Sequence, residues 1–188
     1  MKSGLTASFI ALIVLSVFAN SVYAVLQDDA VAVWLFDESS GKKVTDSSIQ
    51  STSHGDMVGN LEWAEGKNGN GIAFTGEDDS HVNIPHKDVL NLEEFSITVW
   101  AKLETRAGDR SAHWQPFMIK EGDNGERNYS LMVTSPGGEP YVGFSAGGAY
   151  PALTGAAMVV DGQWHHVVGT YDKDGFKLYV TIHLVLFC

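Results

Sequence analysis

Hydrophobic and polar residues alternate along many short stretches of this chain, a pattern typical of β-strands with one buried face. The clearest stretch is residues 95–103, where Phe95, Ile97, Val99, Ala101 and Leu103 share one side. The same reasoning predicts further strands at residues 31–36, 55–59, 72–75, 81–85, 116–120, 129–134, 141–145, 164–172 and 176–180, and one helical turn at 86–91. Many short strands separated by turn residues predict an all-β fold of two antiparallel sheets.

Residues 161–180 hold the most informative pattern. Asp161-Gly162 is a turn signal that favours positive φ and introduces an alternating strand. A second turn at residues 172–175 then leads into another alternating strand, so the stretch predicts a β-hairpin.

Two adjacent histidines lie in the first strand of this hairpin. Successive side chains of a strand point to opposite faces, so His165 and His166 are not expected to bind one metal ion together. We expect His166, which shares a face with Trp164, to be a core or hydrogen-bonded histidine.

The length of 188 residues suits one domain, and a hydrophobic content of 44% indicates a globular protein. The formal net charge of -11 argues against nucleic acid as a partner, because an acidic surface repels phosphates. Neutral glycans, basic partners and calcium are compatible with this charge. The alternative is that the acidic surface only keeps the protein soluble.

The first 24 residues are expected to be a secretory signal peptide. Lys2 precedes the apolar run of residues 9–19, which is short for a membrane span, and Ala24 ends a plausible cleavage site. We therefore expect an exported or cell-surface protein without a membrane span after cleavage. Its single cysteine, Cys188, permits no internal disulfide.

Four segments together resemble the laminin-G-like, concanavalin A-like jelly-roll domains, including the pentraxin-related ones. These segments are VAVWLFDESSG, GIAFTGEDDSHVNIP, FSITVWAKL and DGQWHHVVGTYD with the following KLYV, in that order. The resemblance implies a two-sheet antiparallel jelly-roll sandwich over residues 25–180. It also implies core positions for Trp34, Trp100 and Trp164. The fold hosts lectins, adhesion modules and glycosidases alike, so it does not decide the function.

The last residues depart from the family's pattern. Residues 181–188 are apolar and contain no turn residue, where the family continues through a turn into further strands. We therefore expect a jelly roll that is incomplete at its C-terminal end, and a chain that is a fragment of a larger surface or secreted protein.

Adjacent carboxylates suggest a cation site. In the pentraxin-related domains an acidic pair contributes to a calcium site, and Asp78 and Asp79 match it. The remaining ligands of that site come from a loop beyond the hairpin, so we expect the site to be incomplete. A solvated turn is the alternative, and it is our preferred interpretation for Asp37 and Glu38.

A possible catalytic pattern is Glu121-Gly-Asp-Asn-Gly-Glu126, which is similar to the E-x-D-x-x-E spacing of laminarinase-like glycoside hydrolases. Here Gly and Asn lie between the acids and favour a hairpin turn, which would separate the carboxylates in water. We therefore expect no catalytic activity from these residues.

Two aromatic residues outside the predicted strands are candidates for stacking on a sugar. Trp114 lies in a polar loop, and Tyr150 precedes a proline; packing is the alternative role for both. The sequence thus predicts a non-catalytic binding module for glycan or protein ligands. A glycoside hydrolase of the same fold and a structural spacer are the alternatives.

Overall fold

The structure is a computed structural model that describes residues 29–74, 80–104, 114–121, 127–134, 137–145 and 149–182. The chain divides into two compact units, Met1–Lys87 and Asp88–Cys188, which we describe separately. The regular elements of both units are strands, apart from one 3-10 turn in unit 2, and the described residues contain no α-helix. In this part of the chain, no helix is long and apolar enough to cross a membrane.

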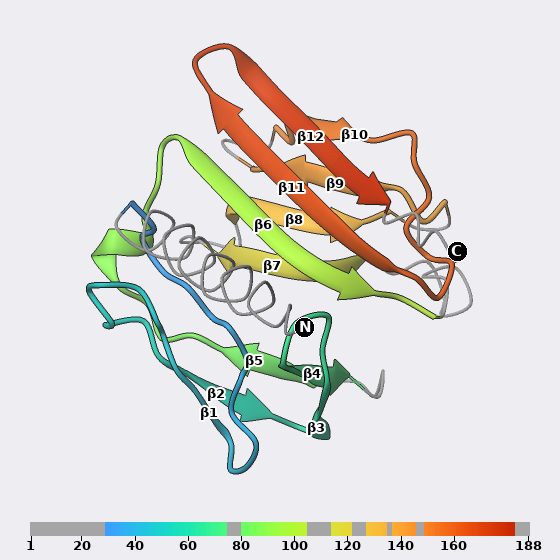
Figure 1. The fold of residues 1–188 in the computed structure, drawn as a ribbon. Coiled ribbons are helices and arrows are strands. Elements are labelled where there is room, and N and C mark those ends of the chain that lie inside the picture. Colours follow the sequence, from blue (N-terminus) through green and yellow to red (C-terminus); the bar gives the residue numbers. More distant parts are fainter. Residues whose placement is uncertain are drawn as a thin grey trace, which may run out of the picture. The chain divides into compact units, whose positions relative to one another are not determined.

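Unit 1, Met1–Lys87, contains a three-stranded sheet and a hairpin. The sheet has the order β1-β2-β5, and the hairpin joins β3 and β4 (Figure 1). The strands are β1 (Lys43–Val44), β2 (Gly55–Val58), β3 (Leu61–Glu65), β4 (Asn70–Phe74) and β5 (His81–Asn83). Val44 and Met57 are its buried hydrophobic residues among those described, so its apolar core is small.

A buried carboxylate compensates for this small core. Asp46 is fully buried, and its two carboxylate oxygens accept hydrogen bonds from the N–H groups of Val33, Ser48, Thr52 and Ser53. Burial alone would raise the pKa of Asp46, but these hydrogen bonds outweigh it and hold the pKa below its ordinary value. The ionised carboxylate therefore fixes the loops on both sides of β1.

Unit 2, Asp88–Cys188, is a sandwich of two antiparallel sheets (Figure 1). One sheet has the order β12-β11-β6 and the other the order β10-β9-β8-β7. The elements are η1 (Asp88–Leu90), β6 (Phe95–Lys102), β7 (Gln115–Glu121), β8 (Arg127–Val133), β9 (Pro140–Gly143), β10 (Ala152–Thr154), β11 (Trp164–Asp172) and β12 (Gly175–Ile182).

The core of unit 2 lies between its two sheets. The buried members of this cluster come from both sheets and from the segment before β11: Phe95, Ile97, Tyr129, Leu131, Val133, Val142, Val159, Val160 and Val167. Burying each larger apolar side chain stabilises the fold by roughly 1.5–3 kcal/mol. At Gly169 a Cβ atom would lie 2.8 Å from Val142 and 2.9 Å from Leu131, so the sheets approach too closely for a side chain.

The all-β sandwich predicted from the sequence is confirmed, and most predicted strands are present within a few residues of their expected ends. The helical turn is present as η1. Three short strands, β1, β3 and β10, were not predicted. The strand expected at residues 31–36 is wrong, because Trp34 makes only an isolated bridge to Asp46. β12 extends to Ile182, and residues 183–188 of the expected tail lie outside the described residues.

The expectation that Trp34, Trp100 and Trp164 are core residues is wrong. All three are partly exposed. Trp100 is opposite His166 and Trp164 is opposite Lys102, on the face of their sheet that points away from the core. The residues that alternate with these tryptophans along the strands, such as Ile97 in β6 and Val167 in β11, form the buried face instead.

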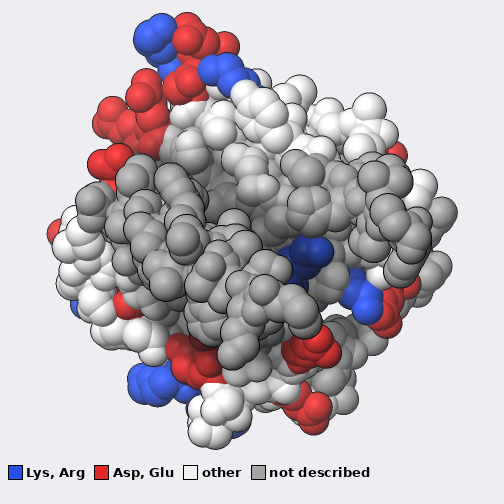
Figure 2. Space-filling model, in the orientation of Figure 1, with Lys and Arg blue, Asp and Glu red and all other residues white. Residues whose placement is uncertain are grey.

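The hairpin predicted from residues 161–180 is confirmed. Gly162 has a φ of 75°, and the N–H of Gln163 donates to the carboxylate of Asp161, which closes the first turn. Charged side chains gather where β11 turns into β12, at the tip of unit 2 (Figure 2). There, Lys177 pairs with Asp172 at 2.9 Å, which joins the two strands beside the turn.

Replacing Asp46 with Ala should lower the free energy of unfolding by about 3 kcal/mol, because buried N–H groups lose their acceptor. The matched control is Asp56→Ala, which removes an exposed carboxylate paired with Lys43 in the same unit and should cost less than about 1 kcal/mol. Urea unfolding of the full chain measures both. Equal losses would contradict the role given to Asp46.

The stabilisation by Asp46 should also depend on pH. Since its folded-state pKa is lowered, the stabilisation is complete above the ordinary value of 3.8 and is lost as the pH falls through the lower value. The difference in unfolding free energy between wild type and Asp46→Ala should therefore shrink below pH 3.8. A difference that stays constant there would show that the carboxylate is not the stabilising form.

Candidate functional site

A pocket of about 350 Å³ lies on the outer face of the four-stranded sheet of unit 2, the face turned away from the core. Its lining comes from β7, β8 and β9 and from the segments before β7 and β10. The described lining residues are Trp114, Pro116, Ile119, Arg127, Met132, Tyr141 and Tyr150. This volume lies near the lower end of the range of about 300–1,000 Å³ that small-molecule sites occupy.

The floor of the pocket follows from strand alternation. Leu131 and Val142 pair across β8 and β9 and point into the core. The next pair, Met132 and Tyr141, therefore points to the outer face. Both are nearly buried, with 2% and 9% of their surface exposed, because the pocket walls cover them.

One wall depends on a β-bulge in β7. Pro116 is opposite Met132 and Met118 is opposite Leu131, so Phe117 is an extra residue in the ladder. Without it, alternation would place Pro116 and Ile119 on opposite faces. The bulge lets both line the pocket, while Phe117 and Met118 pack against the core. Pro116 is tolerated because β7 is an edge strand of the described sheet.

A second bulge, in β8, determines the direction of the Arg127 side chain. Glu121 is opposite Arg127 and Lys120 is opposite Tyr129, so Asn128 is the extra residue in β8. Tyr129 points into the core, and regular alternation would turn Arg127 inward too. The shift turns Arg127 to the outer face, where its guanidinium reaches the pocket.

Aromatic rings form the accessible walls. The indole of Trp114 meets the ring of Tyr141 edge to face, with centroids 4.9 Å apart. Trp114 remains 45% exposed and Tyr150 64% exposed, so part of each ring is accessible from solvent. The guanidinium carbon of Arg127 lies 5.7 Å from the centroid of Tyr150, within cation–π range.

This arrangement suits a ligand with an apolar face and polar edges. Open aromatic rings can stack on such a face, while the guanidinium of Arg127 offers N–H donors beside them. The lining that the structure describes consists of aromatic and aliphatic side chains and this one cation.

Trp114 and Tyr150, the two residues predicted to bind a ligand, lie in this one pocket. That they bind a ligand stays a prediction. Sequence reasoning missed Arg127, Met132 and Tyr141, which complete the pocket. Alternation in β8 and β9 was a signal for Met132 and Tyr141, since it places them on the opposite face from Leu131 and Val142. Nothing in the sequence marks the bulge that turns Arg127 outward.

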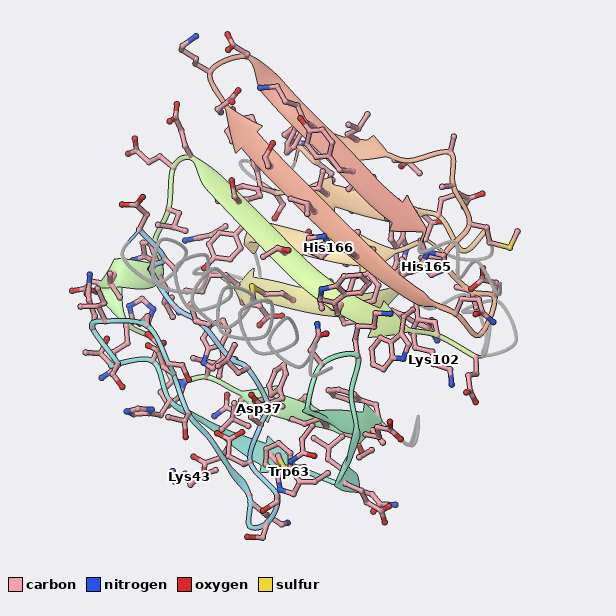
Figure 3. All side chains as sticks on the ribbon, viewed as in Figure 1. Asp37, Lys43, Trp63, Lys102, His165 and His166 are labelled. Atoms are coloured by element: carbon pink, nitrogen blue, oxygen red, sulfur yellow. The ribbon has the colours of Figure 1, made fainter. Side chains whose placement is uncertain are left out.

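The acidic residues considered as cation ligands are only partly described. Asp78 and Asp79 lie outside the described residues. Asp37 (Figure 3) accepts a hydrogen bond from the N–H of Asn70. Glu38 accepts one from the N–H of Thr45, so both acids hold loops of unit 1. The described residues contain no group of three His, Cys, Asp or Glu side chains that could hold a metal ion.

The E-x-D-x-x-E segment is only partly described. Glu121 is exposed at the end of β7, and residues 122–126, which include Glu126, lie outside the described residues. Glu121 is not among the residues that line the pocket.

His165 and His166 point to opposite faces of β11, as predicted, and His165 is the buried one (Figure 3). Its Nε2 donates to Oδ1 of Asp161 at 2.8 Å, and this hydrogen bond holds the pKa of Asp161 below its ordinary value. The expectation of a hydrogen bond at His166 is correct, but the core position is wrong. His166 stacks on Trp100 on the outer face and bonds to Thr98.

A family model of the concanavalin A-like lectin/glucanases superfamily matches residues 75–181, more than half of the chain. The match includes β6 to β11 and nearly all of β12, so it contains every strand that builds the pocket. Comparisons with curated proteins and with solved structures gave no match.

The pocket floor should not tolerate a side chain at Gly143. A Cβ atom there would lie 2.7 Å from Ala152, 2.8 Å from the carbonyl of Pro151 and 2.9 Å from the hydroxyl of Tyr141. Gly143→Ala should therefore lower the free energy of unfolding by about 1–3 kcal/mol through overpacking. Displacement of Tyr141 should also change the near-UV circular dichroism of the Trp114–Tyr141 pair.

The matched control is Gly71→Ala in β4, where a Cβ atom would come no closer than 3.2 Å to its neighbours. We expect a much smaller loss of stability and an unchanged near-UV spectrum. If Gly143→Ala behaves like this control in denaturant unfolding, the described packing of the pocket floor is incorrect.

Proposed function

Because the chain belongs to the concanavalin A-like lectin/glucanase superfamily, we propose that it is a non-catalytic binding module whose aromatic pocket holds a sugar unit of a glycan. The observation that supports this most is the grouping of Trp114, Tyr141, Tyr150 and Arg127 on one sheet face. The fold alone does not choose a ligand, so the proposal depends on these side chains.

A sugar ring matches the pocket in shape and polarity. A pyranose presents C–H groups on its faces and hydroxyl groups around its edge, so it can lie flat on an aromatic ring while its hydroxyls bind polar groups. Trp114 and Tyr150 offer two partly exposed rings, and Arg127 offers donors beside Tyr150. A pocket of about 350 Å³ has room for a short piece of a glycan, in line with recognition of one or two sugar units.

The described wall of the pocket favours binding over hydrolysis. Glycoside hydrolysis uses two carboxyl groups on either side of the scissile bond. The described lining supplies rings, aliphatic groups and a guanidinium instead. A glycoside hydrolase of the same fold remains the second candidate, and the binding assays below include a measurement of released reducing ends.

Export belongs to the same proposal. Residues 1–24 have the pattern of a cleaved secretory signal, which would bring the module to glycans or proteins outside the cytoplasm. An acidic surface with a net charge of -11 keeps such a module soluble and away from nucleic acid.

Removing either open ring should weaken glycan binding. Trp114→Ala and Tyr150→Ala should each lower the affinity for a bound oligosaccharide by at least about tenfold, since a central stacking contact is lost. The melting temperature should stay nearly unchanged for Tyr150→Ala, because that side chain is 64% exposed, and should fall by about a few degrees for Trp114→Ala, which also loses its contact with Tyr141. Calorimetric titration with the oligosaccharides that bind best on an array of cello-, laminari- and xylo-oligosaccharides measures the effect.

The matched control is Tyr179→Ala, which removes a tyrosine that is 54% exposed on β12, in the other sheet. This variant should bind like the wild type. If no array glycan binds, or if the control weakens binding as much as Tyr150→Ala does, the pocket is not the glycan site. Release of reducing ends by the wild type would instead support the hydrolase.

Calcium remains a proposed cofactor. If Asp78 and Asp79 contribute ligands, millimolar calcium should raise the melting temperature of the wild type by several degrees, because an ion that binds only the folded state stabilises it. The double variant Asp78→Asn, Asp79→Asn should show no calcium response. An equal response in both proteins, or none in the wild type, would remove calcium from the proposal.

A further inference from the structure

We infer that the pocket selects glycans that carry a uronic acid, with the guanidinium of Arg127 binding the carboxylate while an aromatic ring holds the sugar. This inference rests on the proposed glycan-binding function and adds the chemical class of the ligand. It comes from the chemistry of the groups around Arg127.

The positive charge of Arg127 is not neutralised by the described residues. Glu121 is its backbone partner across the strands, yet no ion pair joins Arg127 to a carboxylate in the described part of the chain. The described residues that contact its guanidinium are neutral. Nη1 donates to Sδ of Met132 at 3.7 Å, and the Tyr150 ring lies beside the guanidinium carbon.

These contacts orient the guanidinium without supplying a negative charge to pair with it. Arginine has five N–H donors, and the thioether of Met132 is a weak acceptor for one of them. The remaining donors form a planar fork that matches both oxygens of a carboxylate. Apolar walls such as Ile119 and Met132 also reduce screening by water, which strengthens the attraction of an anion to this site.

The geometry suits a uronic acid in particular. The carboxylate of such a sugar is attached directly to the ring, so the ring and the anion must be bound by adjacent groups. Tyr150 is such a neighbour, because its exposed ring is in cation–π contact with Arg127. One residue thus offers a stacking surface while the other offers the ionic contact.

The charge of the whole protein limits how acidic the glycan can be. A net charge of -11 repels a dense polyanion such as a heavily sulfated chain. The described lining contains a single cation, which pairs with one carboxylate at a time. The favoured ligand is therefore a largely neutral glycan with isolated uronic acids.

The test uses an array of oligosaccharide pairs made from glucuronoxylan and from other neutral glycans that carry isolated uronic acid branches. In each pair, the uronic acid form stands beside the same chain after reduction of its carboxylates to hydroxymethyl groups. The wild type should bind an acid form at least about tenfold more tightly than its reduced twin, as expected for a bidentate charged pair. Raising the salt from 50 to 500 mM should weaken binding of the acid form alone.

Arg127→Met keeps a long side chain without the charge. This variant should bind the acid form and the reduced form equally, with the affinity that the wild type shows for the reduced form. Arg127→Lys should restore part of the preference, which a loss through misfolding would not show. The control Lys102→Met removes an equal charge from β6, in the other sheet, and should keep the full preference.

The outcomes separate this inference from the function on which it rests. If the wild type binds acid and reduced twins equally, the pocket binds glycans but Arg127 does not select a carboxylate, and the inference is wrong. If Arg127→Met retains the preference, the carboxylate binds elsewhere and the inference is again wrong. If neither twin binds in any pair, both the inference and the proposed function are contradicted.

Discussion

The structure of unit 2 depends on how closely its two sheets approach at Gly169. A side chain there would overlap with Val142 and Leu131, two residues of the opposite sheet that are completely buried. This contact fixes which faces of β8, β9 and β11 point inward. Because Leu131 and Val142 point into the core, their neighbours Met132 and Tyr141 must point outward. The pocket is therefore a consequence of the core on the other side of the same sheet.

The strands and the sandwich could be predicted because they follow from alternation and turn residues, which are local properties of the sequence. Residues 95–103 and the hairpin after Asp161 illustrate this, since each has a regular pattern with defined ends. Which side of a strand is buried is not local. Trp100 and Trp164 are large and apolar, yet the sheet buries the smaller residues beside them because those face the second sheet.

The site was only partly predictable for a related reason. Trp114 and Tyr150 could be identified because they lie outside the regular strands in polar or proline-containing segments. Arg127 could not, because its direction depends on an extra residue in β8 that the alternation of polar and apolar residues does not reveal. The role of Asp46 was equally hidden, since its four donors come from residues that are up to 13 positions away in the sequence.

The bulge at Phe117 has a consequence for how such a domain can diversify during evolution. Deleting one residue from the edge strand β7 would restore regular pairing and exchange the faces of the residues on one side of the deletion. Gain or loss of a single codon there could thus replace the pocket wall in one step while the central strands keep their register. Lineages that share this sandwich can therefore differ in what they recognise through length changes in β7 as readily as through substitutions.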